Sequence, residues 1–189
     1  SNRAGQGADP VSEWPDLSDA ALAATAAGWL ARRENHQWLD FGNGGQAISP
    51  ALLKVMAQRE QHFLRLYTSP EDDAPLGIAA LNGVDRRFRS AVFWGVAGEK
   101  SFRARGWGTL AGSRFLTLAF RELGLNVIQT WVAEGNPSQR LVERLGFRAV
   151  GRQRQCHAID GRPCDRLLYD LLAEEHRELA DTRPLRATA

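Results

Sequence analysis

The apolar positions of the first half of the chain predict two helices and then three strands. An alanine-rich stretch with late arginines predicts a helix of about residues 19–34, with Ser18 as candidate N-cap, and a second helix starts after Ser49 with Pro50 at its first position. Three apolar runs joined by short polar turns then predict an antiparallel meander of residues 62–68, 76–84 and 90–98.

The second half alternates helix and strand before it closes on a hairpin. Gly124 can end the first of these helices, and Asp160–Gly161 is a strong turn signal for the hairpin. The predicted elements are a helix, a strand, a short helix and two hairpin strands, at residues 107–123, 126–133, 137–145, 147–158 and 162–172. Because helices and strands alternate only in the middle, the pattern predicts a mixed α/β sheet and not a doubly wound one.

The length of 189 residues favours one domain with a substantial core. Residues 13–176 carry the periodic pattern, and we expect them to form that domain. Residues 1–12 are polar and aperiodic and are expected to be a disordered lead. A frayed helix is expected after the last strand, with residues 177–189 as a disordered tail.

Composition removes several function classes. A net charge of +2 argues against a nucleic-acid partner. No apolar run has the length of a membrane span and no signal-like segment opens the chain, so we expect a cytoplasmic protein without a membrane partner. In a two-residue hairpin turn His157 faces Cys164 and Cys156 faces Asp165, which points the two thiols to opposite faces. Neither a disulfide nor a metal site is therefore expected.

A glycine- and arginine-rich stretch joins the third strand to the long helix. It reads Arg103-x-x-Gly106-x-Gly108 and ends where the helix begins. Glycines allow close approach of the backbone to an anion, the first amides of a helix lack intrahelical acceptors, and the helix dipole favours negative charge there. Arg103 and Arg105 add fixed charge, so the stretch suits a phosphate or pyrophosphate. The alternative is a tight turn beside solvated arginines.

This motif resembles the Arg/Gln-x-x-Gly-x-Gly/Ala motif of the GNAT-type acyl-CoA N-acyltransferases. The segment NPSQRLVERLGF, residues 136–147, is similar to the fourth helix of that family. The closing hairpin resembles that of the subset containing the ribosomal-protein alanine N-acetyltransferases. The resemblance covers about residues 15–173.

The resemblance implies a GNAT-like fold: a mixed, mostly antiparallel sheet that is flanked by helices and splayed between two central parallel strands, residues 90–98 and 126–133. Acetyl-CoA would lie in the V between them as co-substrate, with its pantetheine arm along the backbone edge near Val96 and Gly98. The diphosphate would sit on backbone amides of Ala104, Arg105, Gly106, Trp107, Gly108 and Thr109.

The same resemblance implies the catalytic residues. Many family members protonate the leaving thiolate with a tyrosine four residues before the glycine that ends the fourth helix, but this chain has Val142 there. Ser138 matches the serine of the alanine-acetylating subset, and its alternative role is to cap the helix. Asn136 lies two residues before Ser138 instead of three, and we expect it to contact the cofactor.

The general base has several candidates. Glu134 follows the second central strand on the expected acceptor side, where its carboxylate could take a proton, or it could simply be solvated. His157 is an alternative base or a packed residue. His36 and Trp38 lie in the segment that usually lines the acceptor pocket.

The predicted function is therefore transfer of an acetyl group from acetyl-CoA to a primary amine. A small-molecule acceptor such as a metabolite or antibiotic is favoured over a protein N-terminus, in a monomer or homodimer. The alternatives are an acyl-CoA-binding module without turnover and an O-acyltransferase. Thiol release across a panel of amines separates the first alternative from an enzyme.

Overall fold

The computed structural model describes residues 14–41, 48–69, 72–100 and 106–180. The expected lead of residues 1–12 and most of the expected tail lie outside these ranges, as do Arg103, Ala104 and Arg105 of the glycine-rich stretch.

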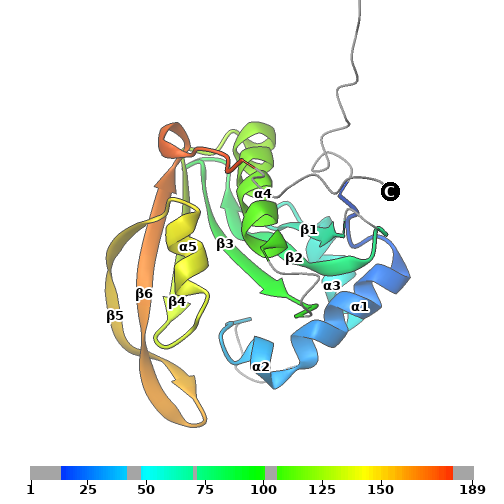
Figure 1. Cartoon of the computed structure of the whole chain (residues 1–189), viewed down its shortest axis with the longest axis horizontal. Coiled ribbons are helices and arrows are strands. Elements are labelled where there is room, and N and C mark those ends of the chain that lie inside the picture. The colour runs from blue at the N-terminus through cyan, green and yellow to red at the C-terminus, as the bar shows by residue number, and fades with distance from the viewer. Residues whose placement is uncertain (1–13, 42–47, 70–71, 101–105, 181–189) are drawn as a thin grey trace, which may run out of the picture.

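The chain forms one mixed sheet with strand order β1-β2-β3-β4-β6-β5 (Figure 1). The strands are β1 (Phe63–Thr68), β2 (Pro75–Asp85), β3 (Ser90–Ala97), β4 (Val127–Ala133), β5 (Arg148–Ile159) and β6 (Arg162–Leu172). Neighbouring strands are antiparallel except for β3 and β4, which are parallel at the centre of the sheet. The predicted fold class is confirmed.

The first predicted helix is split in two and is capped one residue later than expected. Asp19, not Ser18, caps α1 (Ala20–Ala31). Its carboxylate accepts hydrogen bonds from the backbone N–H groups of Ala21 and Leu22. Arg32 adopts an extended conformation, and α2 (Arg33–His36) begins after it.

The other helices follow the sequence pattern closely. Ser49 caps α3 (Pro50–Gln58) as expected. The long helix α4 (Trp107–Leu123) has the predicted bounds and ends at Gly124, whose φ of 60° suits a glycine. The short helix α5 (Gln139–Arg144) precedes β5. In place of the expected frayed helix, β6 leads into a single 3-10 turn, η2 (Ala173–Glu175).

Helices cover both faces of the sheet. Adjacent strand residues point to opposite faces, so Phe93 packs under α4 with Phe115, whereas Trp94 packs with Leu53 of α3 on the other side. The last described residues contact α4, since the N–H of Leu179 donates to Ser113 Oγ at 2.8 Å.

The β5–β6 hairpin has the predicted two-residue turn, with Ile159 opposite Arg162 and His157 opposite Cys164. Its register shifts between Gln153 and His157, so the expected regular pairing of Cys156 with Asp165 is not formed. Both cysteines are free thiols.

The central strands separate after only three residue pairs. β3 and β4 pair at Ser90–Val127, Ala91–Ile128 and Val92–Gln129, and then diverge into the V seen in Figure 1. At the point of separation the buried Thr130 Oγ1 donates to the carbonyl oxygen of Phe93 at 2.8 Å. This side-chain bond replaces the next hydrogen bond of the ladder and satisfies a carbonyl that would otherwise be buried unpaired.

Replacing Thr130 with valine should therefore lower the free energy of unfolding by roughly 1–3 kcal/mol, because the Phe93 carbonyl loses its donor. Chemical denaturation of both variants measures the effect. Thr130→Ser is the matched control, since it keeps the hydroxyl and loses only a methyl group. Equal free energies of unfolding for Thr130→Val and Thr130→Ser would show that this hydrogen bond does not stabilise the point where β3 and β4 separate.

Candidate active site

The gap between β3 and β4 is a pocket of about 560 Å³. It runs through the sheet. On one face its lining comes from α4 and α5, and on the other from α2 and the residues that follow it. Representative lining residues are Gly108, Gly112 and Val142 on the first face and Trp38, Phe41 and Trp94 on the second.

The polar backbone edge inside this gap belongs to Gly95 and Ala97. The N–H of Gly98 donates to the carbonyl of Leu76 on β2 at 2.9 Å. Backbone groups in an antiparallel ladder face the partner strand at every second residue, so Val96 also faces β2. The backbone groups of Gly95 and Ala97 therefore point away from β2 and toward β4, on the same side as the Phe93 carbonyl that accepts from Thr130.

The expectation that Val96 and Gly98 present the free backbone edge is therefore corrected by one residue. Gly98 has a different reason to be glycine: a Cβ there would lie 2.0 Å from Cδ2 of Trp29. Val96 still lines the pocket, but its backbone is directed to β2.

The start of α4 reaches the same pocket. Gly106 caps it with a φ of 79°, in the left-handed region that favours glycine. The first intrahelical hydrogen bond runs from Leu110 to Gly106, so the N–H groups of Gly108 and Thr109 have no acceptor within the helix. Gly108 lines the pocket, and its missing side chain keeps the backbone accessible there.

A tight turn places Asn136 and Ser138 on the pocket wall. The Asn136 side-chain oxygen accepts from the N–H of Ser138 at 2.9 Å, which accounts for the short spacing between these residues. The Ser138 hydroxyl makes no cap hydrogen bond, so Asn136 performs the capping that was considered for the serine. Both residues line the pocket, and Val142 lies one turn further along α5.

Glu134 does not belong to the described lining of the pocket. Its exposed carboxylate accepts a hydrogen bond from Arg152 at 3.2 Å, and Arg152 also binds Asp165 at 2.9 Å. The hydrogen bond from Arg152 is the main cause that lowers the pKa of Asp165. The Glu134 carboxylate thus lies beside Arg152 of the β5–β6 hairpin, whereas it was expected near the acceptor side.

His157 is a structural contact between distant segments. Its Nε2 lies 2.8 Å from the carbonyl oxygen of Gln37, and its Nδ1 lies 3.0 Å from an Arg166 nitrogen. A neutral ring that donates to Gln37 and accepts from Arg166 satisfies both contacts. Both ring nitrogens of His157 are therefore engaged in contacts between segments, as expected for a packed residue.

Residues 33–41, which we call the strap, close the open end of the V. Figure 1 shows α2 below the diverging ends of β3 and β4. Besides the Gln37–His157 bond, Asp40 pairs with Arg166 at 3.1 Å and Arg33 pairs with Asp160 of the hairpin. Through these three contacts the strap joins the N-terminal half of the protein to the β5–β6 hairpin.

Arg166 connects the strap to the pocket wall. Its guanidinium carbon lies 3.8 Å from the ring centroid of Trp131, a pocket residue, in addition to its contacts with Asp40 and His157. Sequence reasoning missed Arg166 and Asp40 because their partners are more than 100 residues apart in the chain. It did place Trp38 correctly on the pocket wall, whereas His36 of the same segment is not in the described lining.

These features fit an acyl-pantetheine ligand with a diphosphate. A slender arm can follow the polar edge of Gly95 and Ala97, while the first turn of α4 offers amides to an anion. Within the described ranges, no group of three or more His, Cys, Asp or Glu side chains could hold a metal ion. In the same ranges, no helix is long and apolar enough to cross a membrane.

A sheet splayed between central parallel strands, with a helix N-terminus at its opening, defines the acyl-CoA N-acyltransferase class. The chain belongs to the GNAT acetyltransferase family, since residues 9–148 match its acetyltransferase (GNAT) domain. The family predicted from the motifs is thus confirmed, and acetyl-CoA is the co-substrate of this class of enzyme.

Individual relatives differ in what they acetylate. The chain is 34% identical over 105 residues to a protein of Bacillus subtilis strain 168 assigned provisionally as the ribosomal N-acetyltransferase YdaF, a match spanning 55% of this chain and 57% of that one. The fold is shared with a ribosomal-protein-S5-alanine acetyltransferase of Vibrio fischeri (TM-score 0.68, 16% identity, 87% and 93% of the two chains). It is also shared with a spermidine N-acetyltransferase of Vibrio cholerae in complex with CoA and spermine (TM-score 0.67, 18% identity, 86% and 95%).

Proposed function

We propose that this protein transfers the acetyl group of acetyl-CoA directly to the primary amine of a small molecule. The observation that carries the small-molecule acceptor is the strap, which bounds the acceptor end of the pocket through its contacts with the hairpin. The whole pocket measures about 560 Å³ and must hold the acyl arm as well as the acceptor. Little room is left for a folded partner at the reacting amine.

The lining of the acceptor end suits an alkyl amine. Trp38 and Phe41 supply aromatic faces, and Glu34 and Asp40 supply carboxylates. Aromatic faces and carboxylates both attract a cationic group. Each carboxylate also has a protein cation nearby, Lys100 at 3.4 Å from Glu34 and Arg166 at 3.1 Å from Asp40, so the site orients an amine without concentrating negative charge.

The reaction mainly requires the protein to hold the thioester and the amine in position. The neutral amine nitrogen attacks the thioester carbonyl carbon and the carbon–sulfur bond breaks. The proton that the nitrogen loses in forming the amide balances the proton that the leaving sulfur gains. In our proposal, an N–H group of Gly95 or Ala97 polarises the carbonyl from the β3 edge. The Ser138 hydroxyl, which is not used as a helix cap, donates to the sulfur as the negative charge develops.

Thiol release from acetyl-CoA in the presence of different amines tests the function. We expect small primary amines such as polyamines to accelerate release and peptides with a free N-terminal alanine to have little effect. Trp38→Ala should raise the KM for the amine about 3- to 30-fold by removing an aromatic wall, with the KM for acetyl-CoA unchanged.

Two results would contradict the proposal. Acceleration by N-terminal peptides alone would make the protein an N-terminal acetyltransferase, in line with its similarity to YdaF. CoA binding without release for any acceptor would indicate a binding module.

Ser138→Ala should lower kcat by roughly 100-fold at unchanged affinity for acetyl-CoA, if the hydroxyl protonates the thiolate. Its melting temperature should stay close to that of the wild type, because the hydroxyl makes no cap bond. Glu134→Gln is the control, and we expect its rate to remain within a few-fold of wild type because the carboxylate binds Arg152 outside the pocket. A normal kcat for Ser138→Ala together with a large loss for Glu134→Gln would reverse these assignments.

A further inference from the structure

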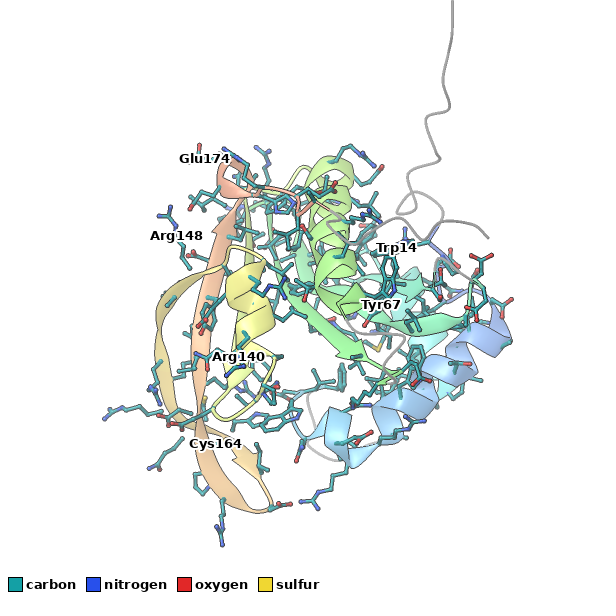
Figure 2. All side chains as sticks on the ribbon, viewed as in Figure 1. Trp14, Tyr67, Arg140, Arg148, Cys164 and Glu174 are labelled. Atoms are coloured by element: carbon teal, nitrogen blue, oxygen red, sulfur yellow. The ribbon has the colours of Figure 1, made fainter. Side chains whose placement is uncertain are left out.

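Tyr67 places a buried hydroxyl beneath the start of α4. Its side chain is 6% exposed and packs in a small cluster with Leu76 and Ala111. Its ring centroid lies 6.4 Å from that of Trp14, and Figure 2 shows the two side chains beside the lower turns of α4. Tyr67 comes from β1, two strands away from the gap, yet it lines the same pocket.

Two glycines make room for this hydroxyl. A Cβ on Gly77 would lie 2.2 Å from the Tyr67 oxygen, and a Cβ on Gly108 would lie 3.4 Å from it. The hydroxyl therefore lies against the backbone of β2 on one side and of the first turn of α4 on the other. Side chains at either glycine would displace it or crowd it.

The protein itself does not satisfy the hydroxyl. Among the described residues no hydrogen bond to it is found, and its oxygen is not one of the fully buried polar atoms, so it opens to the pocket although the side chain is more than nine-tenths buried. Burial also raises the pKa of Tyr67 above its usual value, so the group stays protonated and can donate at neutral pH. A hydroxyl that opens to the pocket and makes no hydrogen bond within the described residues can donate to a bound ligand.

The neighbours of the hydroxyl show which ligand atom suits it. The amides of Gly108 and Thr109 at the start of α4 are donors that have no acceptor within the helix. Backbone donors at a helix start beside a side-chain hydroxyl suit an anionic oxygen, and the dipole of this 17-residue helix favours negative charge there.

We propose that Tyr67 is a CoA-binding residue whose hydroxyl donates a hydrogen bond to a phosphate oxygen at the start of α4. This inference rests on the proposed function, because it assumes that acetyl-CoA is the ligand of the pocket. It adds a side-chain donor from β1 to the backbone donors of the helix.

Tyr67→Phe tests this inference, since it removes the oxygen and keeps the ring. Calorimetry should show CoA affinity reduced roughly 10-fold or more, as for a hydrogen bond to a charged group, and unchanged affinity for pantetheine, which lacks the phosphates. Without ligand the variant should melt close to the temperature of the wild type, because the ring is kept and the hydroxyl, which opens to the pocket, makes no hydrogen bond within the described residues.

Tyr169→Phe is the matched control, because Tyr169 is the other tyrosine of the chain and is also buried. Its hydroxyl already accepts from Gln139 at 3.1 Å, so we expect lower stability without ligand and unchanged CoA affinity.

Unchanged CoA affinity in Tyr67→Phe, or equal losses for CoA and pantetheine, would overturn the role of Tyr67 at the phosphate. Failure of the wild-type protein to bind CoA at all would instead overturn the proposed function on which the inference rests.

Discussion

The site depends on the separation of β3 and β4 after Val92 and Gln129. Continued pairing would fill the centre of the sheet with backbone hydrogen bonds and leave no polar edge for a ligand. Separation exposes that edge but leaves buried backbone groups to be satisfied. Thr130 does this at the first position of the gap, and the remaining groups, at Gly95 and Ala97, face the pocket.

The two sides of the V are also tied together at the open end. The strap contacts the β5–β6 hairpin through Gln37 and Asp40, and Arg166 links those contacts to Trp131 on the pocket wall. A central separation that is closed at one end by sheet hydrogen bonds and at the other by the strap produces a bounded pocket. The proposed preference for a small amine follows from this closure.

Much of the fold could be predicted from the sequence because its signals are local. The bounds of α4 follow from helical periodicity between Gly106 and Gly124. The Asp-Gly turn fixes the hairpin register only up to the His157–Cys164 pair, beyond which the register shifts. Local signals were less decisive for α1, where Ser18 and Asp19 are adjacent cap candidates and only backbone geometry selects the aspartate.

The location of the candidate site could be predicted from the sequence, but the side to which its backbone and side-chain groups point could not. The free edge was assigned to Val96 and Gly98, but it belongs to Gly95 and Ala97. Successive residues of a strand direct their backbone N–H and C=O groups to opposite sides, so an error of one residue in the register points them to the wrong neighbour. Glu134 follows β4 as expected, but its carboxylate contacts Arg152, 18 residues further along the chain, and it is not in the described pocket lining. Tyr67 carries no motif at all, and only the packing of β1 beneath α4 brings it to the pocket.

Amide hydrogen exchange can show whether the ligand pairs with the β3 edge inside the V. Saturating acetyl-CoA should slow exchange at the N–H groups of Gly95 and Ala97, while those of Val96 and Gly98, already bonded toward β2, should change little. Slowed exchange at Val96 and Gly98 with no change at Gly95 and Ala97 would contradict this pairing.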